Sequence, residues 1–278
     1  MDHFDNEGLT FAVEDSGPQD APEHAILLHG FPQTFRSWSS VTPRLTAAGI
    51  RCLAPALRGF TPGAMPAGRR PYRIERLVSD TIALLNQAGL DSAHIVGHDW
   101  GGGIAWQLAM QHPDRVRTLT AVSTPHPAAL QRAVLRSGQG LKSWYMLAMQ
   151  VPVLPEALLG WGIARQGLKG LGLPAEHEQA YIDWLRRPDA LRSAIAAYRA
   201  LFTRRPPGAY AADTRVSRPT TYVWGSRDAY LGRAAAEATA AYCTGDYRFA
   251  ELPADHWLPE KEPAALAAEI LDRINPER

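Results

Sequence analysis

The chain has 278 residues, of which 46% are apolar, so it can bury a sizeable core in one large domain or two small ones. Its formal net charge is +1 with both signs intermixed, which gives no indication of a nucleic acid or a membrane as partner. Two cysteines without metal-binding spacing, Cys52 and Cys243, favour a reducing compartment, and we expect a cytoplasmic protein.

The first half of the chain predicts short strands that alternate with helices. Its acidic start, residues 1–7, lacks the apolar core of a signal peptide, and no apolar run in the sequence is long enough for a transmembrane helix. Strands are expected at 9–14 (as an edge strand), 25–28, 51–55, 94–96 and 116–122, and helices at 38–48, at 74–88 and from Trp100 onward. This alternation predicts an α/β fold with a mostly parallel sheet covered on both faces.

The pattern changes between residues 128 and 217. Strand signals stop there, and helical segments alternate with Pro and Gly breaks, including 206–208. Strands at 220–224 and 247–252, and helices at 232–241 and 263–274, then resume the earlier rhythm. We therefore predict a core domain of residues 1–127 and 218–278. Residues 128–217 are predicted to be a helical cap domain (lid) over the carboxyl edge of the sheet, where ligands bind in open α/β sheets.

The most informative stretch is Gly97-His-Asp-Trp-Gly101, which lies between an apolar strand and a helix. It matches the G-x-S-x-G nucleophile elbow, with Asp99 in place of serine. The glycines allow backbone segments to pass closely while one side chain is held clear of the sheet. Asp99 is thus a candidate nucleophile, although Asp before a helix is often only an N-cap.

Two residues farther along the chain strengthen the nucleophile hypothesis. Asp228 and His256 each follow an expected strand. Alone, Asp228 could be a turn residue and His256 a packed histidine. Together with Asp99 they give the order nucleophile, acid, histidine of the α/β-hydrolase fold. An oxyanion hole needs two converging backbone N–H groups, and the candidates are those of Phe31 and Trp100.

These motifs resemble those of the epoxide hydrolases, within the α/β-hydrolase superfamily. The matching segments are 29–32 (His-Gly-Phe-Pro), 97–102 (Gly-His-Asp-Trp-Gly-Gly), 225–228 (Gly-Ser-Arg-Asp) and 255–257 (Asp-His-Trp). The resemblance covers nearly the whole chain. The elbow and oxyanion motifs are shared with haloalkane dehalogenases, so they do not by themselves separate the two families.

The resemblance gives two tyrosines of the predicted cap a role. Epoxide hydrolases carry one tyrosine upstream of a Gln-x-Pro stretch and another in a Tyr-Arg pair, and Tyr145 and Tyr198 match these positions. Helical spacing predicts that both side chains face the cleft. Their expected neighbours on these faces are Leu141 and Ala148 for Tyr145, and Leu191, Ile195 and Phe202 for Tyr198. The alternative is that both are ordinary core tyrosines.

The resemblance implies hydrolysis of an epoxide to a vicinal diol in two steps. Asp99 attacks a ring carbon while Tyr145 and Tyr198 protonate the ring oxygen, which leaves an alkyl ester on Asp99. His256, oriented by Asp228, then activates the water that hydrolyses this ester. The expected partners are a small lipophilic epoxide and water, with no metal or organic cofactor, no nucleic acid and no membrane. The chain is expected to act as a monomer or a homodimer.

The main alternative is a haloalkane dehalogenase. It would use the same Asp99, Asp228 and His256, with halide held by Trp100 and Trp144, but it would leave the two cap tyrosines without a role. A non-catalytic binding protein of this fold usually lacks part of the triad, and an ordinary esterase would need serine at position 99.

Overall fold

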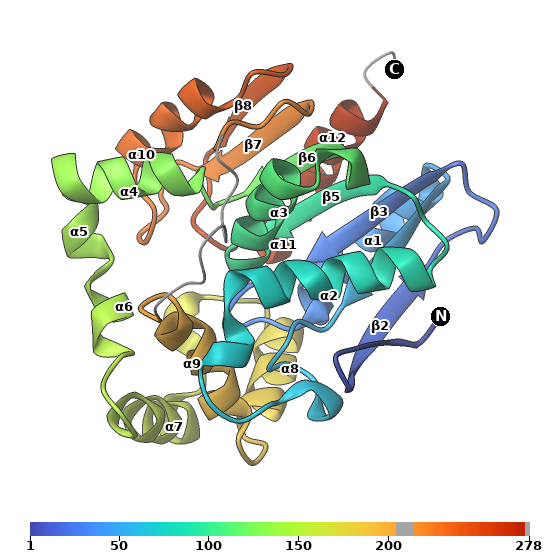
Figure 1. The fold of residues 1–278 in the computed structure, drawn as a ribbon. Coiled ribbons are helices and arrows are strands. Elements are labelled where there is room, and N and C mark those ends of the chain that lie inside the picture. Colours follow the sequence, from blue (N-terminus) through green and yellow to red (C-terminus); the bar gives the residue numbers. More distant parts are fainter. Residues whose placement is uncertain (204–213, 276–278) are drawn as a thin grey trace.

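One eight-stranded sheet runs through the molecule (Figure 1), whose computed structural model describes residues 1–203 and 214–275. The order of strands is β1-β2-β4-β3-β5-β6-β7-β8. The pairs β1–β2 and β2–β4 are antiparallel, and every other pair is parallel, which confirms the predicted α/β class. The strands are β1 His3–Asn6, β2 Leu9–Ser16, β3 Glu23–Leu28, β4 Ile50–Pro55, β5 Ala93–His98, β6 Val116–Val122, β7 Thr220–Gly225 and β8 Tyr247–Leu252.

The central strands read as continuous apolar runs because both faces of the sheet are covered. Side chains alternate between two layers, so that in β3 Ile26 and Leu28 pack in one layer while Ala25 and Leu27 pack in the other. All four are fully buried, and each large one contributes about 1.5–3 kcal/mol relative to exposure. The sheet therefore forms a rigid base for the loops that follow its strands.

Helices cover both faces of this sheet. The layer that contains Leu28 is completed by α2 (Ile74–Gln87) and α3 (Trp100–Gln111), and the opposite layer by α1 (Thr42–Ala47), α11 (Leu258–Lys261) and α12 (Pro263–Ile274). Near β7 lies α10 (Arg233–Ala238) (Figure 1). Short 3₁₀ turns occupy Phe35–Trp38, Pro62–Ala64, Arg70–Tyr72, Pro113–Arg115, Lys169–Leu171 and Thr239–Tyr242.

Six further helices lie together beside the core (Figure 1). They are α4 Pro127–Arg136, α5 Gln139–Lys142, α6 Trp144–Ala148, α7 Leu154–Gln166, α8 Ala175–Leu185 and α9 Ala190–Ala200. The division into a core and a cap domain of residues 128–217 stays a prediction. Residues 204–213 of that segment, with the expected break at 206–208, lie outside the described residues.

Most predicted elements are present, but some differ from the prediction, such as the helix expected over 232–241, which is divided into α10 and a 3₁₀ turn. Strand β2 is not an edge strand, because β1 pairs with its outer side. Strand β1 was not predicted, since Phe4 is its one buried side chain. The helix expected over 38–48 is divided into a 3₁₀ turn and α1, which begins with Pro43 in its first turn, where proline is well tolerated. In the described part of the chain, no helix is both long and apolar enough to cross a membrane.

Candidate active site

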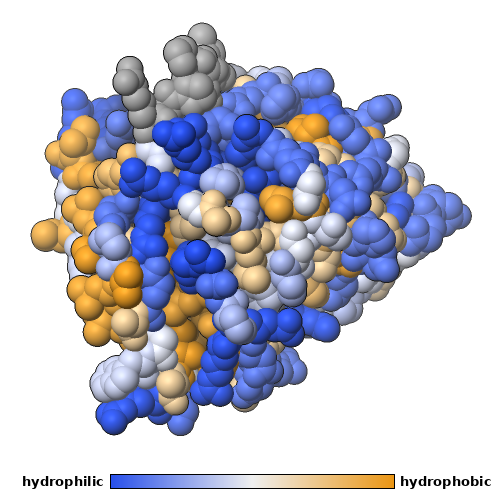
Figure 2. Space-filling model, turned by 60° about the horizontal axis from the view of Figure 1, so that its bottom comes forward, coloured by the Kyte–Doolittle hydropathy of each residue, from blue (hydrophilic) through white to orange (hydrophobic). Residues whose placement is uncertain are grey.

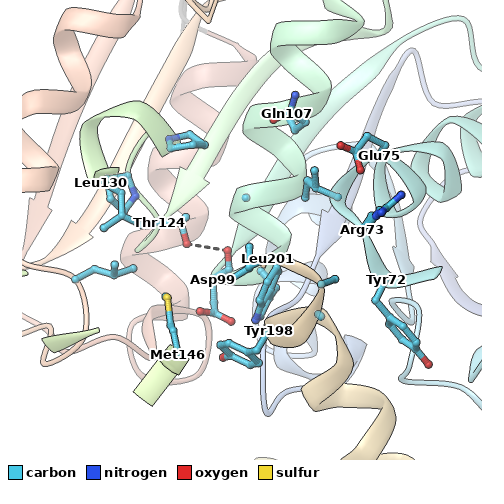
Figure 3. Close-up of a pocket in the computed structure, with 18 of the residues that line it drawn as sticks. Tyr72, Arg73, Glu75, Asp99, Gln107, Thr124, Leu130, Met146, Tyr198 and Leu201 are labelled. Atoms are coloured by element: carbon cyan, nitrogen blue, oxygen red, sulfur yellow. Dashed lines mark hydrogen bonds between the residues drawn. The ribbon is translucent and has the colours of Figure 1, made fainter. Parts of the chain in front are cut away.

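Asp99 lies in a tight turn between β5 and α3. Its backbone has φ 51° and ψ −115°, a conformation that is strained for any residue but glycine. The turn needs its glycines, because a Cβ on Gly101 would lie 2.1 Å from the carbonyl oxygen of Leu28. Thr124 Oγ1 donates a hydrogen bond of 2.8 Å to the Asp99 carbonyl (Figure 3). The Asp99 carboxylate does not cap α3, so the N-cap alternative does not account for this residue.

Loops after three different strands bring Asp99, Asp228 and His256 together. His256 Nδ1 lies 2.7 Å from Asp228 Oδ2, and His256 Nε2 lies 3.6 Å from Asp99 Oδ2. The second oxygen of Asp228 accepts hydrogen bonds from the backbone N–H groups of Tyr230 at 2.7 Å and Leu231 at 2.9 Å. Asp228 is therefore fixed in a turn and at the same time orients the imidazole toward Asp99.

The charges of the three residues are coupled. Burial lowers the pKa of His256, but the charge and hydrogen bond of Asp228, together with Asp99, outweigh burial and raise it to about 10. Burial raises the pKa of Asp99, and the neighbouring imidazole of His256 and the Phe31 N–H outweigh it, so that the pKa ends below its ordinary value. At neutral pH the resting site thus holds a carboxylate on Asp99 opposite an imidazolium on His256.

The loop after β3 supplies a backbone donor to Asp99. The N–H of Phe31 donates a 2.8 Å hydrogen bond to Asp99 Oδ1. A Cβ on Gly30 would lie 2.4 Å from the Asp99 Cβ, so only glycine allows this approach. Trp100 is the second expected oxyanion donor. Within the described residues, its N–H makes no hydrogen bond to the Asp99 carboxylate. The role of Trp100 stays a prediction.

Both predicted tyrosines lie close to this carboxylate. The Tyr198 ring packs edge-on against Phe31 and Trp100, with centroid distances of 5.5 and 5.0 Å, and the Tyr145 ring lies 6.1 Å from Tyr198. Burial, followed by the charge of Asp99, raises the pKa of each phenol above its ordinary value of 10. Both hydroxyls therefore keep their protons at neutral pH.

The helical faces expected around these tyrosines are only partly correct. Leu191 and Ile195 are buried on the Tyr198 side of α9, but Phe202 lies beyond the end of that helix and is 57% exposed. Leu141 belongs to the separate helix α5 and is 82% exposed, because the helix is interrupted at Ser143 before α6 begins. The prediction assumes one continuous helix on each side, but the helices are interrupted at Ser143 and end at Ala200, positions that the sequence does not mark with proline or glycine.

Two cavities meet at the candidate nucleophile. They measure about 220 and 240 Å³, and Asp99, Tyr145 and Tyr198 line both. In the first cavity (Figure 3) Asp99 and Tyr198 face the same space, and the polar side chains of Arg73, Glu75 and Gln107 lie farther away. The second cavity is apolar away from the site, with the lining residues Met149, Leu159, Ile163, Leu168, Leu185 and Leu191.

A buried network that the sequence did not reveal supports the site from behind. Gln33 Oε1 accepts a hydrogen bond from the Gly30 N–H at 2.8 Å, and Gln33 Nε2 donates to Glu260 Oε1 at 2.6 Å. The Tyr181 hydroxyl on α8 donates to the same oxygen of Glu260 at 2.7 Å. Burial raises the pKa of Glu260. The network thus ties the Phe31 loop to α8, and its one sequence signal is that Gln33 directly follows His-Gly-Phe-Pro.

The backbone of the candidate histidine is also held in place. The His98 Nε2–H and the Ser123 hydroxyl both donate to the carbonyl oxygen of His256, at 2.8 and 2.9 Å. Tyr230, another residue that the sequence did not single out, packs its ring against the imidazole with a centroid distance of 5.1 Å. No group of His, Cys, Asp and Glu side chains among residues 1–203 and 214–275 is arranged to hold a metal ion.

Comparison with known proteins gives the family. The model of the α/β hydrolase fold family matches residues 24–152. Over 275 residues the chain is 33% identical to the AB hydrolase superfamily protein YfhM of Bacillus subtilis, with 96% of this chain and 95% of that protein covered. It is also 33% identical over 273 residues to human epoxide hydrolase 4, covering 92% of this chain and 73% of the relative. The chain belongs to the epoxide hydrolase family.

This epoxide hydrolase family member also shares its fold with solved structures. One of the epoxide hydrolases found in metagenomes from hot environments superposes with a TM-score of 0.82 at 26% identity, over 98% of this chain and 97% of the other. The predicted α/β-hydrolase fold and the expectation of a hydrolase enzyme are thereby confirmed.

Proposed function

We propose that this enzyme opens an epoxide to a vicinal diol through a covalent ester on Asp99. The observation that carries the proposal is the shared position of three groups: Asp99, Tyr145 and Tyr198 line both cavities, with His256 3.6 Å from the carboxylate. A carboxylate suits displacement at carbon, and two protonated phenols suit an oxygen leaving group. Residues 128–217 act as the cap that brings these phenols over the nucleophile.

In the first step, a carboxylate oxygen of Asp99 attacks one ring carbon, and the bond between that carbon and the ring oxygen breaks. Tyr145 or Tyr198 donates its proton to the ring oxygen, which becomes a hydroxyl group. Their raised pKa values keep both phenols available as acids. The product is a hydroxyalkyl ester of Asp99, a covalent intermediate that carries no charge on this side chain.

The loss of charge on Asp99 prepares the second step. Asp99 is one of the two carboxylates that raise the pKa of His256, and once it is an ester only Asp228 remains. The pKa of His256 then falls, its proton returns to the tyrosinate through solvent, and the neutral imidazole becomes a base. The same histidine is thus a resting cation and an active base at one pH.

In the second step, His256 takes a proton from water, and the hydroxide attacks the ester carbonyl carbon. The Phe31 N–H stabilises the resulting oxyanion, together with the expected Trp100 N–H. Collapse breaks the bond between the carbonyl carbon and the alkyl oxygen. The new carboxylic acid gives its proton to that oxygen, so the diol leaves, Asp99 is ionised and His256 is protonated as at the start.

The dehalogenase alternative uses the same triad and needs a second halide donor in the cap. Trp144, the candidate for that donor, has 66% of its surface exposed and lines neither cavity. The alternative also leaves Tyr145 and Tyr198 beside the nucleophile without a purpose. Both observations favour the epoxide.

Trapping the intermediate tests the two-step scheme. In His256→Gln the first step should proceed and the second should stop, because only the second needs the base. Intact-mass analysis after mixing with a lipophilic epoxide such as styrene oxide should show one adduct, located on the peptide that contains Asp99. The matched variant Asp99→Asn should show none at that site. Normal turnover by His256→Gln would contradict the scheme.

Tyrosine variants separate the two chemistries. General acid catalysis contributes about 10²–10⁴-fold and the remaining tyrosine covers part of it, so Phe at Tyr145 or Tyr198 should slow alkylation by about 10- to 1000-fold. The double variant should lose nearly all of it. Tyr230→Phe is the matched control, since its ring lies 6.1 Å from that of Tyr145 without an assigned role in ring opening. Single-turnover alkylation that is unchanged in all variants, with halide released from haloalkanes, would establish the dehalogenase instead.

A further inference from the structure

Exposed apolar side chains are concentrated on one part of the molecule. Of the twelve large apolar residues that are exposed in the described chain, ten lie between Val134 and Trp161. We call the seven leucines and tryptophans among these, which are 52% to 82% exposed, the cap apolar face: Leu135, Leu141, Trp144, Leu147, Leu154, Leu158 and Trp161. Figure 2 shows apolar residues gathered on the side where Figure 1 places α5, α6 and α7. Such a concentration marks an interaction surface rather than scattered single residues.

Helix α7 shows why this surface is unusual. Leu159 and Ile163 point inward and line the second cavity. Leu154, Leu158 and Trp161, spaced by four and three residues, share a different face that is exposed. A helix that is apolar on two faces needs apolar surroundings on both. In the described structure, the face with Leu159 and Ile163 has such surroundings and the face with Trp161 does not.

The segment that carries the cap apolar face is predominantly basic. Residues 128–174 contain five basic residues and a single acidic one. The acid, Glu156, is paired with Arg199, whose guanidinium donates hydrogen bonds of 2.5 and 2.8 Å to its two carboxylate oxygens. All five basic residues are exposed: Arg132, Arg136, Lys142, Arg165 and Lys169. The Arg165 guanidinium lies 4.7 Å from the centroid of the Trp161 ring, so at least this cation borders the apolar side chains.

We propose that the cap apolar face docks on the surface of an anionic lipid bilayer. Leucine and tryptophan side chains beside lysine and arginine are the combination that binds lipid interfaces, where the apolar groups enter the headgroup region and the cations contact lipid phosphates. A second copy of the chain fits less well, because a two-fold contact would bring the same exposed cations face to face. The net charge of the whole chain conceals this asymmetry, since acidic residues elsewhere cancel it.

The position of this surface connects it to the cavities. Helices α6 and α7 carry exposed members of the cap apolar face, while Tyr145, Met146, Leu159 and Ile163 of the same two helices line the cavities. A lipophilic epoxide dissolved in the bilayer would therefore enter next to the lipid surface. This delivery rests on the proposed function, whereas the docking does not.

Co-sedimentation with vesicles tests the docking without any substrate. The full-length protein is mixed with vesicles of phosphatidylcholine alone, or of phosphatidylcholine with phosphatidylglycerol, at low and high salt. We expect binding to the anionic vesicles that weakens with salt. Leu158→Ser combined with Trp161→Ser should weaken it by about tenfold or more, because the buried apolar area drives insertion. Arg132→Glu combined with Arg136→Glu should remove the preference for anionic lipid.

The control is Phe202→Ser, since Phe202 is 57% exposed, like Trp161 at 58%, and lies outside the cap apolar face. It should bind vesicles as the wild type does. Wild-type protein that stays in solution with both vesicle types would overturn the proposal. Analytical ultracentrifugation gives a second way to overturn it. If the wild type is a dimer, and Leu158→Ser combined with Trp161→Ser makes it monomeric without changing vesicle binding, the face binds a second copy of the chain. Diol formation from a soluble epoxide without lipid is measured in parallel, so loss of docking and failure of the proposed function are distinguished.

Discussion

The ion pair between Asp99 and His256 allows a quantitative prediction. Asp99→Asn removes the charge but keeps the shape of the side chain and an oxygen for the Phe31 N–H. Over 3.6 Å, two unit charges interact by about 4–5 kcal/mol at an effective dielectric constant of about 20. This equals about three pKa units, and water reaching the 17% exposed Asp99 side chain reduces it. We expect the pKa of His256 to fall from about 10 by about two to three units.

The assay is an NMR titration of the His256 imidazole in protein labelled with ¹³C-histidine, with His256→Gln used for assignment. The control is Asp255→Asn: Asp255 adjoins His256 in the chain, but its carboxylate pairs with Lys261. This control should leave the His256 pKa close to that of the wild type. An unchanged pKa in Asp99→Asn would refute the coupling, and with it the reasoning that alkylation of Asp99 turns the histidine into a base.

Three further predictions follow from other contacts of the site. Asp228→Asn should slow ester hydrolysis by up to about 10⁴-fold, because the imidazole of His256 loses its correct tautomer. Alkylation should stay nearly unchanged, and single-turnover kinetics would separate the two steps. Glu260→Leu leaves the buried donors of Gln33 and Tyr181 unpaired, and should lower the unfolding free energy by about 2–6 kcal/mol in urea titrations. Folding raises the pKa of His256 from 6.5 to about 10, so the stabilisation by this residue is complete below about pH 6.5 and is lost as the pH rises through 10. In urea titrations across this pH range, the unfolding free energy should decline less steeply for His256→Gln than for the wild type.

The catalytic candidates were accessible from the sequence because each lies within four residues of the carboxyl end of a strand. The ends of parallel strands meet at one edge of a sheet, so Asp99, Asp228 and His256 could be placed together from their order alone. Tyr145 was found through its resemblance to the family and not through its helical face, which the break at Ser143 makes discontinuous.

The supporting contacts could not be predicted in the same way. Gln33 and Glu260 are 227 residues apart, and neither belongs to a periodic pattern that would reveal their contact. Strand β1 was missed because a strand with a single buried residue has almost no hydrophobic alternation. The exposed side of α7 was hidden for the opposite reason: apolar residues all around a helix predict burial and do not say which face lacks a cover.

The two cavities are nearly equal in volume, about 220 and 240 Å³, but unlike in polarity. In the proposed mechanism, an epoxide with two different substituents can enter this site in two directions, and turning it end for end would offer the other ring carbon to Asp99. Because both cavities can hold substituents of similar size, the length of a substituent alone does little to favour one direction of binding over the other. A polar substituent prefers the side of Glu75 and Gln107, and a preference of about 1.4 kcal/mol gives a tenfold ratio of the two sites of attack. The proposed mechanism thus implies that side chains at the far side of the first cavity, and not the groups around the reacting atoms, would decide the regiochemistry.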